Sequence, residues 1–143
     1  MLHIARTSGG GGAGVDQAIA MDVTGVSDLR VTYLGYVNYE DGGNIGGGNA
    51  RWFPEGGAQV RVFYTDANGQ ATEWYHGMCM TPTSGLDPNF QQIPDNQWTE
   101  YTSDNLMELD PKLARIDTVR FYSFGWGFDA MFDDCNLFIE GYE

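Results

Sequence analysis

Arginine and aromatic residues share the same side of three apolar segments in this sequence. Aromatic rings stack on the apolar C–H faces of sugars, and guanidinium groups donate hydrogen bonds to hydroxyls or pair bidentately with a carboxylate or sulfate. We therefore expect one face of a β-sheet to carry these side chains and to bind a glycan. The pairs are Arg30 with Tyr36, Arg61 with Phe63, and Arg120 with Tyr122.

The same arginines also have an alternative, purely structural role. Asp22, Glu73 and Glu140 occupy segments that we expect to lie beside them, and cross-strand ion pairs of this kind stabilise a sheet modestly. Strand register does not follow from the sequence. The sequence therefore leaves both roles open.

Four further residues are candidates for ligand contact. Trp74 and His76 lie two residues apart, so in a strand they share a face on which both would touch a sugar. A histidine in this setting is more typical of a packed or sheet-face residue than of a general base. Trp52 and Trp126 stand beside loop glycines, where indole rings either form a binding platform or close an end of the fold. We include Trp126 with Trp74 and His76 among the predicted binding residues.

Sequence motifs for catalysis are missing. The chain has no GxSxG, HExxH or GxxxxGKS motif, and no GxGxxG between a strand and a helix, which removes the usual signatures of serine hydrolases, zinc proteases and nucleotide-binding enzymes. Its 20 acidic residues include no distinctive catalytic pair. We expect a noncatalytic protein, with a small lyase or hydrolase as the least favoured alternative.

The composition indicates one folded, acidic domain spanning residues 1–143. Of the 143 residues, 42% are hydrophobic and 14% aromatic, far from the composition of disordered chains. Seven basic and 20 acidic residues give a formal net charge of −13, which disfavours binding to nucleic-acid phosphates or anionic membranes. No apolar run approaches the roughly 20 residues of a membrane-spanning helix. We expect no nucleic-acid partner and no membrane insertion.

Eight segments rich in β-branched and aromatic residues are expected to form strands. Turn-forming clusters separate them, as in antiparallel sandwiches and barrels, and Asn68-Gly69 predicts a hairpin. Eight is also the strand number of a jelly roll. The sequence therefore predicts an all-β fold, an antiparallel β-sandwich of the jelly-roll type. The expected strands are residues 2–6, 17–23, 29–39, 59–65, 71–80, 98–101, 116–124 and 131–139.

Glycine and proline mark the expected loops. Residues 9–14 hold five glycines and predict a flexible loop. Residues 40–50 hold another five, more than a simple hairpin needs, and residues 81–97 hold three prolines. Long loops in compact domains are often functional, so we expect them to shape a site. A short helical turn is expected within residues 106–111.

Several segments resemble the galactose-binding-like jelly rolls of bacterial surface proteins. They are VRVFYTDANG at residues 60–69 with the Trp74 that follows, VRFYSFGWGFDA at 119–130, and DDCNL at 133–137. The resemblance extends over residues 17–139 and includes the carbohydrate-binding modules attached to glycoside hydrolases. It implies a glycan or polysaccharide as partner. The alternative is a structural subunit whose aromatic face mediates self-assembly in a filament or surface layer.

The same resemblance implies a structural calcium ion. Members of such families often hold calcium through a carboxylate on the last strand and through loop carbonyls, and Asp133-Asp134 lies at the matching place. Calcium takes 6–8 oxygen ligands, some of which the glycine-rich loops would supply. Asp134 is the preferred ligand, with Asp133 as a turn cap; the alternative is a pair of solvated carboxylates.

The cellular location and the cysteine chemistry are further expectations. The chain begins within a strand-like pattern and lacks a signal-peptide layout, which favours a mature form or a piece of a longer protein with other domains. The acidic composition and the resemblance favour an extracellular or cell-surface location. Cys79 and Cys135 lack metal-ligand spacing. They either form a disulfide or act as two buried thiols.

Overall fold

Alternating apolar and polar residues build the long strands of this protein. In β3 (Asp28–Asp41), Leu29 and Val31 are buried while Arg30 between them is partly exposed. Val60 is buried in the same way in β4 (Gly56–Asp66). This is the two-residue period of strands with one face against a core, and the sides predicted to be apolar are the buried ones.

The computed structural model describes residues 1–141, which form nine strands and one short 3-10 helix. The helix η1 (Leu106–Glu108) is capped by Asn105, whose side chain accepts the backbone N–H of Met107 at 3.0 Å, and it confirms the predicted helical turn. The other strands are β1 (Leu2–Arg6), β2 (Gly11–Asp22), β5 (Ala71–Cys79), β6 (Phe90–Gln92), β7 (Thr99–Thr102), β8 (Leu113–Gly125) and β9 (Gly127–Glu140).

Two sheets face each other in a jelly-roll arrangement. One has the strand order β1-β9-β3-β7 and the other β2-β8-β4-β5-β6. Apart from β6, which runs parallel to β5, all neighbouring strands are antiparallel. The remaining eight strands make up the double-sheet fold. The predicted all-β sandwich is confirmed, and each of the eight predicted segments forms a strand.

The short strand β6 is the one that the sequence did not predict. Its three residues lie in the proline-containing segment expected to be an irregular loop. The backbone N–H of Gly77 in β5 donates to the carbonyl of Asn89 at 3.0 Å, and a Cβ on Gly77 would overlap the ring of Phe90. Pairing with an exposed strand edge, rather than local alternation, therefore forms β6.

The glycines at residues 11–14 belong to β2 rather than to the predicted flexible loop. They pair with residues 122–125 of β8. A Cβ on Gly14 would overlap Phe121 and Tyr122, so the close approach of the two strands requires glycine here. Hydrogen bonds to β8 supply an order that the local composition does not indicate.

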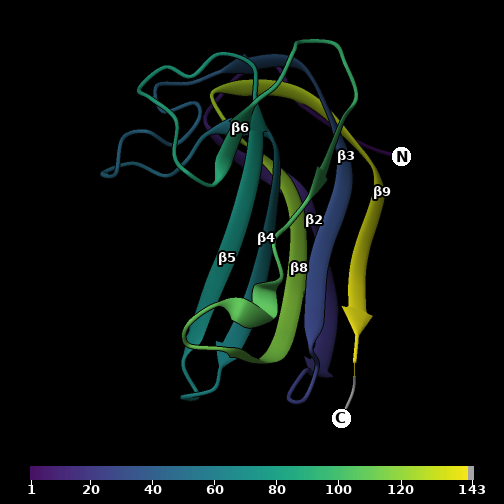
Figure 1. Ribbon diagram of the computed structural model, residues 1–143. Helices are drawn as coiled ribbons and strands as arrows, with labels where there is room; N and C mark the ends of the chain where they lie inside the picture. The colour runs from purple at the N-terminus through teal and green to yellow at the C-terminus, as the bar shows by residue number, and fades with distance from the viewer. Residues whose placement is uncertain (142–143) are drawn as a thin grey trace.

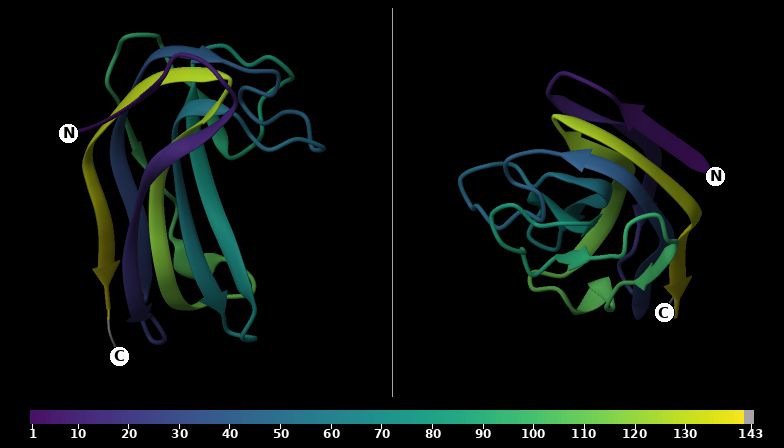
Figure 2. Two further views of the ribbon diagram at one scale, coloured as in Figure 1. Left: turned by 180° about the vertical axis from the view of Figure 1, so that it is seen from behind. Right: turned by 90° about the horizontal axis from the view of Figure 1, so that it is seen from above.

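The long loops gather at one end of the sandwich, and η1 lies at the other (Figure 1). The loop between β3 and β4 projects beyond the sheets in every view (Figures 1 and 2). Leu106 and Met107 of η1 are buried and close the opposite end of the core. Within residues 1–141, no helix is long and apolar enough to cross a membrane.

The core between the sheets takes large side chains from both of them. Tyr33, Phe128 and Phe132 come from the four-stranded sheet, and Met78 and Ile116 come from the five-stranded sheet; each is at most 1% exposed. Burying an apolar side chain of this size contributes about 1.5–3 kcal/mol. The core therefore fixes which face of each strand is left for solvent.

The hairpin between β4 and β5 forms at Asn68-Gly69, as the sequence predicts. The carboxylate Oδ1 of Asp66 accepts the backbone N–H groups of Asn68 at 2.8 Å and Gln70 at 3.0 Å. Gly69 has a φ of +80°, in the left-handed region that favours glycine. The turn thus depends on one side-chain cap and one glycine.

Replacing Gly69 with alanine is expected to lower the free energy of unfolding by about 1 kcal/mol, because a Cβ is unfavourable at a positive φ. Gly43→Ala is the matched control. A Cβ would meet no other atom within 4 Å at either position, but only Gly69 of the two has a positive φ. Urea unfolding followed by tryptophan fluorescence measures both variants, and equal stabilities would contradict this explanation.

Candidate functional site

The outer face of the five-stranded sheet carries the arginine and aromatic residues of two neighbouring strands. Because the valines of β4 are buried, Arg61 and Phe63 point outward. On β8, Arg120, Tyr122 and Phe124 lie on the side opposite the core residues. The prediction that these side chains share a sheet face is confirmed for β4 and β8.

Arg61 and Arg120 lie directly opposite each other in the β4–β8 ladder, a placement that destabilises unpaired like charges. Each has its own carboxylate. Arg61 Nη1 donates to Glu73 Oε1 at 2.7 Å. Arg120 binds Asp16 through two hydrogen bonds, Nε to Oδ1 at 2.6 Å and Nη2 to Oδ2 at 2.9 Å, which lower the pKa of Asp16. Of the three carboxylates named as alternative partners, Glu73 pairs with Arg61, whereas the partner of Arg120, Asp16, was not among them.

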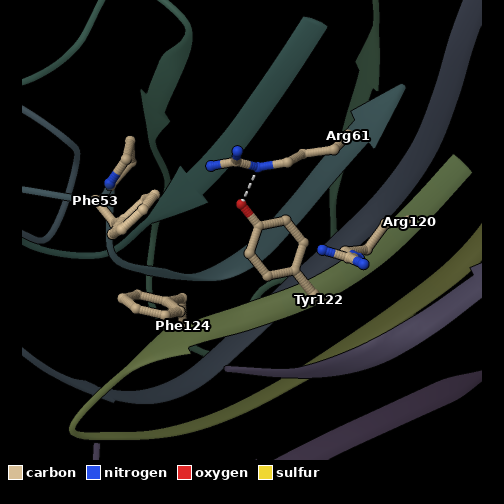
Figure 3. Close-up of a pocket in the computed structure, with 6 residues that line it drawn as sticks. Phe53, Arg61, Arg120, Tyr122 and Phe124 are labelled. Carbon is tan, nitrogen blue, oxygen red and sulfur yellow. Dashed lines mark hydrogen bonds between the residues drawn. The ribbon is translucent and has the colours of Figure 1, made fainter. Parts of the chain in front are cut away.

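Tyr122 lies between the two guanidinium groups on the floor of the site (Figure 3). Arg61 Nε donates to its hydroxyl oxygen, and the hydroxyl donates to Oε1 of the buried Gln59 at 2.9 Å. Gln59 Nε2 in turn lies 3.3 Å from each of its acceptors, the carbonyls of Pro54 and Gly56. Burial raises the pKa of Tyr122, which keeps the phenol neutral. This network ties the sheet face to the β3–β4 loop.

Asn44 holds the β3–β4 loop, residues 42–55, beside the sheet. It is buried, and its Nδ2 donates to the carbonyls of Asn49, Trp52 and Phe53, each at 3.1 Å. The ring of Phe53 thereby lies against that of Phe124 (Figure 3), with centroids 6.1 Å apart and planes inclined at 58°. The glycine-rich loop thus forms one wall of the site.

Three adjoining hollows make up one groove, which we call the sheet groove. The first, of about 210 Å³, lies between Phe53 and Tyr122. The second, of about 360 Å³, extends past Arg120 to the glycines of β2. The third, of about 380 Å³, lies beside Trp126 and the β3–β4 loop. Phe124 lines all three, so its ring is common to the three hollows.

Trp52 and Trp126 form an exposed aromatic wall at the loop end of the sheet groove. Their exposed fractions are 67% and 59%, and both line the third hollow. Phe53, between the first and third hollows, is 72% exposed. The alternative in which the two indoles close an end of the sandwich is therefore wrong.

Arg30 and Tyr36 do not belong to this face, which corrects the prediction of one face with three arginines. Both lie on β3 in the four-stranded sheet. Arg30 pairs with Asp28 at 2.9 Å, and the ring of Tyr36 packs against Trp98 with centroids 5.3 Å apart. Alternation predicts correctly that both point outward, but the jelly-roll topology decides which sheet contains their strand.

Trp74 and His76 face the core, which corrects their prediction as sugar contacts. They lie opposite Val62 and Val60 on the inner face of the sheet. The Nδ1 atom of His76 lies 2.8 Å from the hydroxyl oxygen of Tyr33, inside the sandwich. The alternative of a packed histidine is confirmed.

The environment of His76 makes it a neutral structural residue. Its ring is 5% exposed and stacks on that of Tyr101, with centroids 3.4 Å apart and planes inclined at 8°. Burial lowers the pKa of His76 to about 4 and raises the pKa of Tyr101 to about 12. Both rings therefore remain uncharged at neutral pH.

Asp133 and Asp134 lie at an irregularity within β9, away from the glycine-rich loop expected to complete a calcium site. Asp133 pairs with Leu34, in the middle of β3. The loop begins after Asp41, the last residue of β3, which pairs with Gly127. Asp133 Oδ1 accepts the backbone N–H of Asp134 at 3.0 Å, as a turn cap would. Among the described residues, no group of three or more Asp, Glu, His or Cys side chains is placed to hold a metal. Calcium at this place stays a prediction.

Cys79 and Cys135 are both free thiols. Cys79 is buried, while Cys135 is exposed. The disulfide alternative is therefore wrong, and the expectation of a buried thiol holds for Cys79 alone. Burial raises the pKa of Cys79 to about 12, so this thiol stays protonated and behaves as a small apolar group.

The residues of the sheet groove that were not singled out from the sequence include Phe124, Phe53 and Asp16. Phe124 follows Tyr122 on the outward side of its strand, so alternation was sufficient to find it. Phe53 lies in a loop, and Asp16 lies between the predicted loop at residues 9–14 and the predicted strand at residues 17–23, so no period indicates a direction for either. Only the tertiary structure brings those two to the groove.

Fold and site together define a jelly-roll β-sandwich with an aromatic, arginine-bearing groove on one sheet. No family model, no curated protein and no solved structure matches this chain. The chemistry of the sheet groove is therefore the basis for assigning a function.

Acid is expected to destabilise the fold through His76. The pKa of this residue is about 4 in the folded protein and 6.5 when exposed, so the unfolded chain binds the additional proton between these values. Stability is therefore lost as the pH falls from 6.5 towards 4, by roughly 3 kcal/mol in all. Thermal unfolding between these pH values, with wild type and His76→Gln compared, measures the contribution.

The exposed His3 provides the matched control, as His3→Gln. Burial raises the pKa of Glu40, so this carboxyl binds its proton more readily in the folded protein than in the unfolded chain. Its protonation therefore favours the fold as the pH falls, equally in wild type, His76→Gln and His3→Gln. The pH dependence is expected to be shallower in His76→Gln alone. Identical pH profiles of wild type and His76→Gln would show that the imidazole does not drive the acid response.

Proposed function

We propose that this chain is a noncatalytic carbohydrate-binding module that holds a glycan or polysaccharide in the sheet groove. The observation that carries the proposal is the alternation of rings and hydrogen-bonding groups along this groove. Phe53, Phe124 and Tyr122 lie beside Arg61 and Arg120. Rings stack on the C–H faces of sugars, while guanidinium groups bind hydroxyls.

The rigidity of these side chains supports the proposal. Arg61 is fixed between Glu73 and Tyr122, and its side chain is only 12% exposed. Arg120 is fixed by Asp16 and lies over the ring of Phe63, 5.0 Å from its centroid. Groups that are already ordered lose little conformational entropy when a ligand binds. A flexible ligand such as a sugar chain benefits from such a preordered surface, because its own ordering already costs conformational entropy.

The shape of the sheet groove suits an extended ligand. Gly12 and Gly14 line its β2 end. Trp52 and Trp126 line the other end. Two of the three hollows lie within the volume range of small-ligand sites, so a chain of several sugar units would occupy the groove along its length.

The resemblance to galactose-binding-like jelly rolls and to carbohydrate-binding modules supports the same function. A fold by itself does not assign a ligand, so the resemblance adds to the groove chemistry and does not replace it. By this proposal the module acts outside the cell or at its surface. It would bind sugars for other domains of a longer chain.

Self-assembly is the second candidate function, and one observation favours it. Trp52, Phe53 and Trp126 are each more than half exposed, and clustered exposed aromatic residues often mark protein interfaces. A glycan array read beside light scattering separates the two. Saturable sugar binding by a monomer supports the module, whereas ordered association without sugar binding supports the assembly subunit.

Phe53→Ala is expected to weaken glycan binding about tenfold, because it removes a stacking surface worth about 1.4 kcal/mol. The side chain is 72% exposed, so its removal leaves the fold intact. Isothermal titration calorimetry with the best ligand from the array measures the change.

Phe138→Ala is the matched control for this measurement. Phe138 is 48% exposed and lies on β9 in the other sheet, so its removal is expected to leave the affinity unchanged. An equal loss in both variants, or no loss in Phe53→Ala, would mean that sugars bind elsewhere on the protein.

A further inference from the structure

Both cations that line the sheet groove already have carboxylate partners. Arg61 binds Glu73 at 2.7 Å, and Arg120 binds Asp16 at 2.6 Å and 2.9 Å. Among residues 1–141, no other arginine or lysine lines the three hollows. The third hollow adds the carboxylate of Glu55 without a cation. The groove therefore has no uncompensated positive charge to offer a ligand.

The rest of the molecule adds to this negative balance. The chain carries a formal charge of −13, and charges within about 8–10 Å still interact at physiological ionic strength. An anionic group entering the groove would approach Asp16 and Glu73 together with the arginines. To pair with a guanidinium it must either displace the carboxylate that is already bound, which leaves that carboxylate without its partner, or bind the remaining N–H donors directly beside a carboxylate of the same charge.

The polar atoms that remain available match hydroxyl groups. Among the described residues, Arg61 Nη2 and Arg120 Nη1 have no hydrogen-bond partner, so each offers free donors. The oxygens of Glu73 and Asp16 beside them are acceptors. A hydroxyl both donates and accepts, so it serves both halves of an ion pair, whereas an ionised carboxylate or sulfate only accepts.

We infer that the sheet groove selects uncharged glycans and discriminates against uronate-bearing and sulfated ones. This inference rests on the proposed function. It replaces the expectation that the arginines bind an acidic group of the ligand, since Asp16 and Glu73 already occupy that role. Glycan hydroxyls bind across each ion pair, and the rings of Phe53 and Phe124 hold the C–H faces.

The inference is tested with neutral polymers and with acidic polymers whose sugar units have the same ring configuration. Mannan is compared with polymannuronate, and galactan with polygalacturonate, within a wider array of neutral and acidic glycans. In each pair that binds, the neutral polymer is expected to bind about tenfold more tightly or better. Its affinity is expected to stay constant between about 0.05 and 0.5 M NaCl, because no net charge is neutralised.

Asp16→Asn tests the mechanism within the groove. It frees Arg120 without adding bulk, so affinity for the acidic polymer is expected to rise about fivefold, while affinity for the neutral polymer changes less than about twofold. Asp117→Asn is the matched control, because Asp117 pairs with Arg115 at 2.9 Å and neither residue lines the groove. Circular dichroism melting checks that both variants fold.

Two kinds of failure are distinguishable. If the acidic polymers bind as tightly as the neutral ones or more tightly, or if Asp16→Asn behaves like the control, the selectivity is overturned while sugar binding stands. If no glycan of either charge binds to the wild-type protein, the proposed function itself fails and the inference fails with it.

Discussion

The register between β4 and β8 is the constraint on which both the core and the sheet groove depend. Val62 lies opposite Val119 on the inner face, and Arg61 lies opposite Arg120 on the outer face. A slip by one residue would turn the arginines into the core and the valines to solvent. Burying an unpaired ion costs several kcal/mol, so a slip by one residue is strongly disfavoured. The burial of the valines therefore determines where the groove residues stand.

Two opposed arginines stay adjacent because the strands on either side each supply a carboxylate. Glu73 comes from β5 and Asp16 from β2. Ion pairs at this degree of exposure contribute little to stability. Their larger effect is geometric and electrostatic: they hold the guanidinium planes in place around Tyr122, and they turn a potential anion site into a neutral surface of donors and acceptors. The loop held by Asn44 then adds the aromatic wall.

How much of this structure the sequence predicts depends on how clearly the residues of each strand divide into an apolar side and a polar side. The outward direction of Arg61 and Tyr122 was predictable because their neighbours along the strand are strongly apolar. In β5 both sides are mixed, so alternation did not reveal that Trp74 and His76 face inward. The strand β6 and the glycine start of β2 escaped prediction because their order comes from hydrogen bonds to other strands.

By itself the sequence determined the all-β class, the eight main strands, the Asn68-Gly69 turn and the inner and outer sides of β3, β4 and β8. These features depend on side-chain period and on turn chemistry, which are local properties. Only the tertiary structure decided that Arg30 belongs to the other sheet, that Asp16 neutralises Arg120 and that Phe53 meets Phe124. Those contacts join residues far apart in the chain, and no local pattern specifies which distant backbone will lie beside a given strand.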